Sequence, residues 1–177
     1  SIRRNANAAL SAATLITTTK LKNFDGLSRK KVQDYAIWHI RSIACQHQST
    51  SLGGWGETWQ STLWAATAGQ AGWLLWDRLS EAERGYVAAM VEGEANAAAR
   101  RGPRYFRDRA GTEISPGNSK ADEVSWDLLA PTLALAMMPK HKNAKIWKES
   151  AIALSLAAFS RPGDLTKKRS INGINVA

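Results

Sequence analysis

The lengths of the connections between helical segments constrain the fold of this chain most strongly. Apolar residues recur at helical spacing over six segments, about residues 4–19, 28–47, 57–78, 80–100, 120–138 and 142–160. The connections near residues 79–80 and 139–141 are short, which predicts antiparallel helix pairs. The connections over residues 48–56 and 101–119 are long. Because successive helices alternate in direction, both long connections are expected at the same end of a helical array.

The prediction is therefore an all-α fold of antiparallel helical hairpins. The chain has 177 residues, which is the size of one domain, so a single domain is expected over residues 1–177. Ser80 and Glu83 match a helix capping box, and Ser28 is placed to cap the second helix. Pro131 is expected to kink the fifth helix or to begin a second piece. Strand patterns are weak.

The two helices of one hairpin differ in how their apolar residues are distributed. From Trp59 to Trp76, apolar side chains occur on every face, which predicts a helix that is enclosed on all sides. The following segment sets Val87 and Val91 against a row of acids that includes Glu94, which predicts an outer, amphipathic helix. The next hairpin repeats this order, so an alternation of inner and outer helices is expected.

The chain is strongly basic. Lys and Arg exceed Asp and Glu by 24 − 15 = 9, which predicts attraction to acidic glycans, nucleic acids or phospholipid headgroups. Between residues 100 and 109, five arginines accompany one acid, Asp108. They are candidates for binding an anionic partner, and the alternative interpretation is a solvated basic face. The single cysteine, Cys45, excludes an intrachain disulfide. No apolar run reaches the ~18 residues that span a bilayer, so a soluble protein without a membrane partner is expected.

Two helix openings share one layout, in which a glycine-marked loop is followed by carboxylate or amide side chains and then by a tryptophan. They cover residues 53–60 and 117–126. Acids at helix starts often cap free backbone N–H groups; alternatively, two of them act as acid and base in glycoside hydrolysis. The catalytic candidates are Glu57, Asp122 and His47, and the substrate-binding candidates are Trp55, Trp59, Gln60, Asn118, Glu123, Trp126, Arg104 and Tyr105.

The aromatic candidates fit a glycan site, because aromatic faces pack on the apolar faces of sugar rings. Trp55 lies between glycines and is the tryptophan expected to face solvent, with burial in the core as the alternative for the others. His47 ends the second helix and is a candidate base, with a structural histidine as the alternative. His39 and His47 alone do not make a metal site, and no nucleotide or serine-hydrolase motif occurs. We therefore expect no metal and no cofactor.

Four segments carry a family resemblance, namely residues 54–61, 72–77, 120–126 and 136–141. They resemble a poorly characterised group of secreted microbial proteins that is similar to the six-hairpin (α/α) toroid glycosidases and polysaccharide lyases. The resemblance covers about residues 45–175. It implies part or all of an (α/α) toroid, in which three hairpins correspond to the N-terminal half of a longer chain. It also implies an extracellular or cell-envelope location.

Together these features predict a protein that acts on an acidic, uronate-containing polysaccharide or oligosaccharide. In the lyase form, Asn118 or Arg104 neutralises the uronate, and His47 or a tyrosine removes the C5 proton. In the hydrolase form, Glu57 and Asp122 are the acid and the base. The main alternative is a non-catalytic helical-repeat protein that binds a partner or serves as a scaffold. Nucleic-acid binding through the basic clusters ranks last, because no recognised motif supports it.

Overall fold

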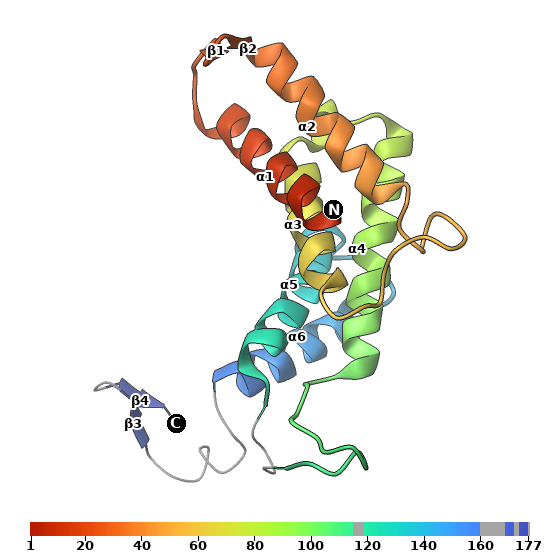
Figure 1. Ribbon diagram of the computed structural model, residues 1–177, viewed down its shortest axis with the longest axis vertical. Coiled ribbons are helices and arrows are strands. Elements are labelled where there is room, and N and C mark those ends of the chain that lie inside the picture. The colour runs from red at the N-terminus through yellow and green to blue at the C-terminus, as the bar shows by residue number, and fades with distance from the viewer. Residues whose placement is uncertain (115–118, 160–168, 172–173, 177) are drawn as a thin grey trace.

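The computed structural model describes residues 1–114, 119–159, 169–171 and 174–176. This part of the chain contains six α-helices, a turn of 3-10 helix and two short antiparallel β-hairpins (Figure 1). The helices are α1 (Ile2–Thr18), α2 (Arg29–Ala44), α3 (Ser61–Leu74), η1 (Trp76–Arg78), α4 (Glu81–Arg101), α5 (Ala121–Met137) and α6 (Ala144–Phe159). The strands are β1 (Asn23–Phe24), β2 (Leu27–Ser28), β3 (Arg169–Ile171) and β4 (Ile174–Val176). The all-α prediction is confirmed, and each expected helix occurs within a few residues of its expected bounds.

The helices form a stack of three antiparallel hairpins in two layers. Helices α1, α3 and α5 pack side by side in one layer, and α4 contacts both α2 and α6 in the other. The hairpins α1–α2, α3–α4 and α5–α6 follow one another down the long axis of the molecule in Figure 1. The chain therefore has the hairpin order that the connection lengths predicted.

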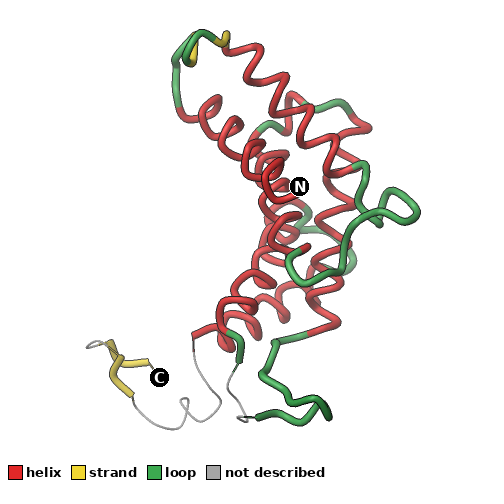
Figure 2. Tube along the Cα trace, in the orientation of Figure 1, coloured by secondary structure: helices red, strands yellow, loops and turns green. Residues whose placement is uncertain are grey.

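The short and long connections lie at opposite ends of these hairpins. The turns between α3 and α4 and between α5 and α6 are short, whereas the loops before α3 and α5 are long. Figure 2 shows both long loops leaving the lower ends of their helices. We call the loop end the region formed by residues 45–60, the described residues between 102 and 120, and the first turns of α3 and α5.

The core consists mainly of small side chains, so the helix backbones approach one another closely. Fully buried alanines line α1, α2 and α3, and larger side chains such as Ile40, Met90 and Trp147 fill the remaining space. A second, smaller cluster beside the loop end joins α4, α5 and α6 through Ala98, Val124 and Leu154. Close packing of small residues makes the stack sensitive to added volume.

Helix α3 is not enclosed on all sides, so that prediction is wrong. Its buried residues are small or hydroxylated, among them Ser61, Thr62 and Gly69, whereas Trp73 and Leu74 are exposed. At Gly69 a Cβ atom would lie 2.6 Å from a methyl group of Val91, which shows how tightly α3 packs on α4. The apolar composition of α3 therefore reflects a small-residue face that packs on its neighbours.

Helix α4 is more buried than an outer amphipathic helix would be. It contacts α2, α3, α5 and α6. It buries Val87 and Val91 and, on the same side, the acid Glu94. Glu94 follows Val87 by seven residues, which is two helical turns, and so shares its face. The sequence-based assignment of Glu94 to the solvent face is wrong.

The helix boundaries follow the expected local signals. Ser80 and Glu83 form a complete capping box at the start of α4, and the hydroxyl of Ser28 accepts the N–H of Lys31 at 3.3 Å. Helix α5 runs through Pro131 as one element of 17 residues, so no second piece begins there. Among the described residues, no helix has both the length and the apolar character required to cross a membrane.

Candidate functional site

The first long loop is fastened to the end of α2 by Trp55. Its indole N–H donates to the carbonyl of Ile43 at 2.9 Å, and its ring meets His47 edge-on with centroids 4.8 Å apart. Its backbone N–H donates to the carbonyl of Gln46 at 3.1 Å. Gly54 permits this approach, because a Cβ atom there would lie 2.4 Å from the same carbonyl oxygen. Trp55 was expected to face solvent, and it is instead a half-buried anchor.

Beneath this loop, the carboxylate of Glu94 is fully buried and accepts four hydrogen bonds. The donors are His47 Nε2 at 3.2 Å, the backbone N–H of Glu57 at 2.8 Å, Ser61 Oγ at 3.0 Å and Thr62 Oγ1 at 2.8 Å. These groups come from the end of α2, from the loop and from the start of α3. One side chain of α4 thus holds three other segments in place.

The charge state of Glu94 follows from these contacts. Burial by itself raises the pKa of the Glu94 carboxyl, but the four hydrogen bonds, that from His47 foremost, lower it more, so the pKa lies below its ordinary value of 4.5. Glu94 is therefore ionised at neutral pH. The Nδ1 atom of His47 accepts the N–H of Ser49 at 3.2 Å, which leaves Nε2 to donate to Glu94.

A second buried carboxylate, Asp127 on α5, binds two arginines. Arg101 donates to its two oxygens at 2.7 and 3.2 Å, and Arg104 donates at 2.7 and 3.4 Å. Arg104 also lies 3.7 Å from Glu123. The hydrogen bond with Asp127 is the main cause of a raised pKa at Arg104. These contacts hold the end of α4 and the start of the second long loop on α5.

Thr62 links the two buried carboxylates into one network. The Thr62 hydroxyl donates to the Glu94 carboxylate, and the Nη2 atom of Arg101 lies 3.4 Å from the hydroxyl oxygen of Thr62. Neither Glu94 nor Asp127 was among the sequence-based candidates. Helical spacing carried the signal for both, because Asp127 follows the buried Val124 by three residues just as Glu94 follows Val91.

On the outer side of this network, the loop end brings Trp59 and Trp126 together. Their ring centroids lie 5.8 Å apart and the rings are inclined at 67°. Trp59 is 60% exposed, whereas Trp126 is half-buried. Trp59 lies just before α3, and Trp126 lies in the second turn of α5. The two tryptophan-led helix openings therefore meet at one end of the molecule, as the sequence predicted.

Glu57 lies in the loop before α3, with a left-handed backbone at φ 49°. Its carboxylate is exposed and pairs with the exposed Arg100 at 2.6 Å. Asp122, in the first turn of α5, is exposed and has no hydrogen bond or ion pair with any described residue. Gln60 is half-buried directly before α3. Among the candidate acids, Asp122 is thus the one whose carboxylate is free of other described side chains.

Tyr105 lies on the second long loop and is half-buried, and its backbone pairs with that of Ser119. Glu123 is bound by Arg104 and lies 3.5 Å from Lys120 Nζ, so its charge is largely neutralised. Asn118 lies outside the described residues. His47 is fully buried, which removes its ring from contact with a ligand and argues against the role of base that its sequence position suggested.

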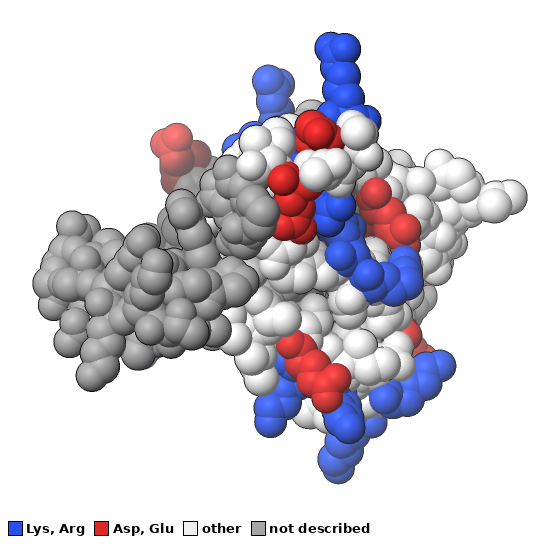
Figure 3. All heavy atoms as spheres, turned by 90° about the horizontal axis from the view of Figure 1, so that it is seen from below, with Lys and Arg blue, Asp and Glu red and all other residues white. Residues whose placement is uncertain are grey.

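The arginine cluster does not form a free positive surface. Acids from elsewhere in the chain neutralise most of it, and Figure 3 shows acidic and basic side chains interspersed on this end of the molecule. Arg109 has no acidic partner among the described residues. The ion pairs are Arg100 with Glu57, Arg101 with Asp127, Arg104 with Asp127 and Glu123, and Arg107 with Glu113.

In the described part of the chain, no group of three or more His, Cys, Asp or Glu side chains is placed to hold a metal ion. The chain matches no protein-family model, no curated protein and no solved structure.

Proposed function

We propose that the three hairpins form part of an (α/α) toroid, and that the loop end binds and acts on an acidic, uronate-containing polysaccharide. The exposed Trp59, packed against Trp126 at the openings of two helices, carries this proposal. An exposed indole offers a flat apolar surface beside a polar N–H group, which suits one face of a sugar ring. Its fixed contact with Trp126 limits the rotamer freedom that it loses on binding.

The charges around the tryptophan pair favour an acidic sugar over a neutral one. Arg100 is exposed, and its ion pair with Glu57 lies in solvent, where such pairs contribute little to stability. A uronate carboxylate can therefore replace Glu57 as the partner of Arg100 at small cost and gain a bidentate contact. Arg109, on the same long loop as Tyr105, is a cation without an acidic partner among the described residues.

Two forms of catalysis are consistent with these side chains. In the hydrolase form, the exposed Asp122 and the exposed Glu57 serve as base and acid, each at the opening of a different helix. In the lyase form, Arg104 or Asn118 neutralises the uronate; for Arg104 this requires the uronate to compete with Asp127 and Glu123 for the guanidinium. The burial of His47 leaves Tyr105 as the base that removes the C5 proton. Under this proposal, a location outside the cell or in its envelope follows from the substrate.

The second candidate is a non-catalytic protein that binds the glycan or a protein partner at the same end. The ion pairs of the acids favour it, because Glu94, Asp127 and Glu123 are all neutralised by neighbouring cations or donors. In this case the only role of the Asp122 carboxylate is a favourable interaction with the helix dipole at the start of α5. Turnover separates the two candidates.

The experiment is a screen of uronic-acid polysaccharides that measures binding, the formation of new reducing ends and the ultraviolet absorbance of an unsaturated product. Reducing ends without absorbance identify a hydrolase, and both signals together identify a lyase. Binding without either signal identifies the non-catalytic protein. Absence of binding to every uronic-acid polysaccharide would remove the proposal.

The matched substitutions are Trp59→Ala and Trp73→Ala, since both tryptophans are exposed and belong to the two ends of the same helical segment. We expect Trp59→Ala to weaken polysaccharide binding about fivefold or more, because an aromatic platform of this kind contributes ~1–3 kcal/mol. Trp73→Ala should leave the affinity unchanged. Equal losses in both variants would show that binding does not take place at the loop end.

A further inference from the structure

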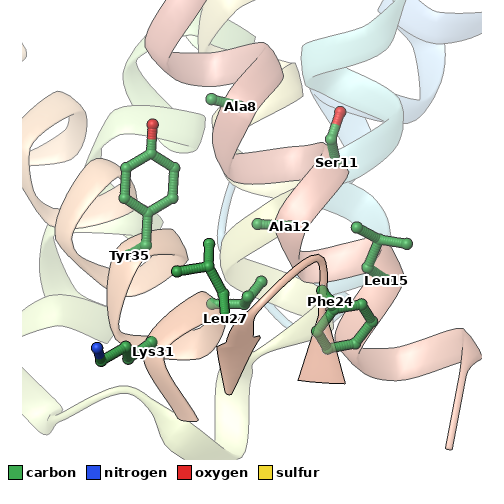
Figure 4. Close-up of a pocket in the computed structure, with 9 residues that line it drawn as sticks. Ala8, Ser11, Ala12, Leu15, Phe24, Leu27, Lys31 and Tyr35 are labelled. Carbon is green, nitrogen blue, oxygen red and sulfur yellow. The ribbon is translucent and has the colours of Figure 1, made fainter. Parts of the chain in front are cut away.

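The first hairpin contains a second candidate site, far along α2 from the loop end. A cavity of about 500 Å³ opens between α1, the start of α2 and the β1–β2 hairpin. Its walls are formed mainly by Leu15, Phe24, Leu27, Val32 and Tyr35 (Figure 4). This volume lies within the range of ligand sites, ~300–1,000 Å³.

The short β-hairpin forms one wall of this cavity. Phe24 and Leu27 are paired directly across the two strands, which places both beside α1 and α2. Leu27 is 51% exposed and Leu15 is 43% exposed, so large apolar side chains on facing sides remain in contact with water. Covering apolar surface of this kind with a ligand removes it from water, which favours binding.

The polar groups of the cavity define the other half of its ligand. The hydroxyls of Ser11 and Tyr35 have no hydrogen-bond partner among the described residues. Lys31 lines the edge of the cavity, and Figure 4 draws its ammonium on the outer side of the apolar group. The nearby acid on α2, Asp34, is already paired with Lys30 at 2.6 Å. Lys31 has no ion pair with a described acid, and so adds a positive charge at the edge of the cavity.

We propose that this cavity binds an anionic amphiphile of the fatty-acid class. The aliphatic chain lies against Leu15, Phe24 and Leu27, and the carboxylate remains at the mouth, where the ammonium of Lys31 reaches it from solvent. Aliphatic walls with one cation at the opening recognise this chemistry, because the chain is desolvated while the charged group stays hydrated. The proposal is independent of glycan binding at the loop end.

The probe is dodecanoate, titrated into the full chain by calorimetry at concentrations at which it is monomeric. Saturable binding with one site is expected. Dodecyltrimethylammonium, which has the same chain with a positive headgroup, should bind at least threefold to fivefold more weakly, the size of an exposed charge interaction. Absence of saturable dodecanoate binding, or equal affinity for the cationic probe, would overturn the proposal.

Three variants locate the site on the chain. Lys31→Gln should weaken dodecanoate binding threefold to fivefold and leave dodecanol binding unchanged. Lys22→Gln removes an exposed lysine that does not line the cavity. It should change the affinity for neither dodecanoate nor dodecanol. Ser11→Phe places a ring in the cavity from an exposed position of α1 and should abolish binding of both probes.

Circular dichroism and thermal melting establish that each variant keeps its fold. Equal losses of dodecanoate affinity in Lys31→Gln and Lys22→Gln would show that general surface charge causes the effect. That result would contradict binding in this cavity. Undiminished binding to Ser11→Phe would place the ligand elsewhere. Binding to vesicles of anionic phospholipid, without binding to monomeric dodecanoate, would identify a membrane surface as the partner and also contradict the proposal.

Discussion

At the scale of single residues, two buried carboxylates determine the shape of the loop end. Glu94 and Asp127 are almost inaccessible to water, so their charges depend on the hydrogen bonds of neighbouring segments. Removing one partner of such a buried charge typically costs ~3–5 kcal/mol. The loops that carry Glu57 and Tyr105 are therefore positioned by residues that do not themselves reach the surface.

Replacement of Glu94 by Gln is expected to lower the free energy of unfolding by about 3 kcal/mol, because the amide presents N–H groups to donors that now bind a carboxylate. Urea unfolding measures this loss. Glu92→Gln is the control, since Glu92 is a half-buried acid on the same helix that lies 3.4 Å from His141. It should cost less than ~1 kcal/mol. Similar losses in the two variants would contradict the role assigned to Glu94.

Single residues also show where reading the sequence succeeded and where it failed. The layout of residues 53–60 and 117–126 correctly predicted that two tryptophans meet, but it exchanged the roles of Trp55 and Trp59. The partial burial of Trp55 accompanies a hydrogen bond from its indole N–H to a backbone carbonyl elsewhere in the folded chain. The acceptor is the carbonyl oxygen of Ile43, and the spacing of residues in the sequence does not predict this contact.

At the scale of elements, helix α4 and the first long loop depend on each other. Gly93 lies where the loop crosses α4, and a Cβ atom at this position would lie 2.1 Å from Ser49 Oγ and 3.3 Å from His47 Cε1. The loop can therefore rest on the helix only where the helix lacks a side chain. Helical periodicity predicted the length of α4 well, but the glycine contact is visible only in three dimensions.

Gly93→Ala and Gly85→Ala form a matched pair on this helix. At Gly93 the added methyl group pushes the loop away, so we expect a loss of ~1–3 kcal/mol in the free energy of unfolding. At Gly85 a Cβ atom meets nothing within 4 Å, and alanine should stabilise the helix by up to ~1 kcal/mol. Thermal unfolding followed by circular dichroism compares them. A gain at both positions would mean that the loop does not rest on α4.

The elements themselves were largely predictable, because six amphipathic or apolar segments with clear breakers leave few alternatives to helical hairpins. The burial of α4 was less predictable, because the acidic residues within this segment suggested a solvated face. Glu92 and Glu94 differ by about 200° around the helix, so one half-buried and one fully buried acid occur within three residues. Composition alone does not separate them.

At the scale of the whole molecule, two groups make the stability depend on pH. Burial lowers the pKa of His39 below 6.5, and both of its ring nitrogens lack hydrogen-bond partners among the described residues. As the pH falls below about 6.5, the unfolded chain binds a proton that the folded chain does not, so stability decreases. The lowered pKa of Glu94 has the same sign and adds a further loss as the pH falls below about 4.5.

Urea unfolding between pH 8 and pH 4 should therefore show stability decreasing in two stages as the pH falls. His39→Phe should remove the first stage and retain the second, because an aromatic ring of similar shape fills the space between Tyr35 and Trp38 without a titrating group. An unchanged pH dependence between pH 7 and pH 5 in His39→Phe would contradict this assignment.

The measurement that tests the central claim most directly is a nuclear magnetic resonance titration of the tryptophan indole N–H signals with an oligogalacturonate. Substitution of single tryptophans assigns the signals. Binding at the loop end predicts saturable shifts for Trp59 and Trp126, while Trp38 and Trp73, which are exposed elsewhere on the stack, stay in place. Unmoved signals for Trp59 and Trp126, or equal shifts at Trp73, would contradict the account.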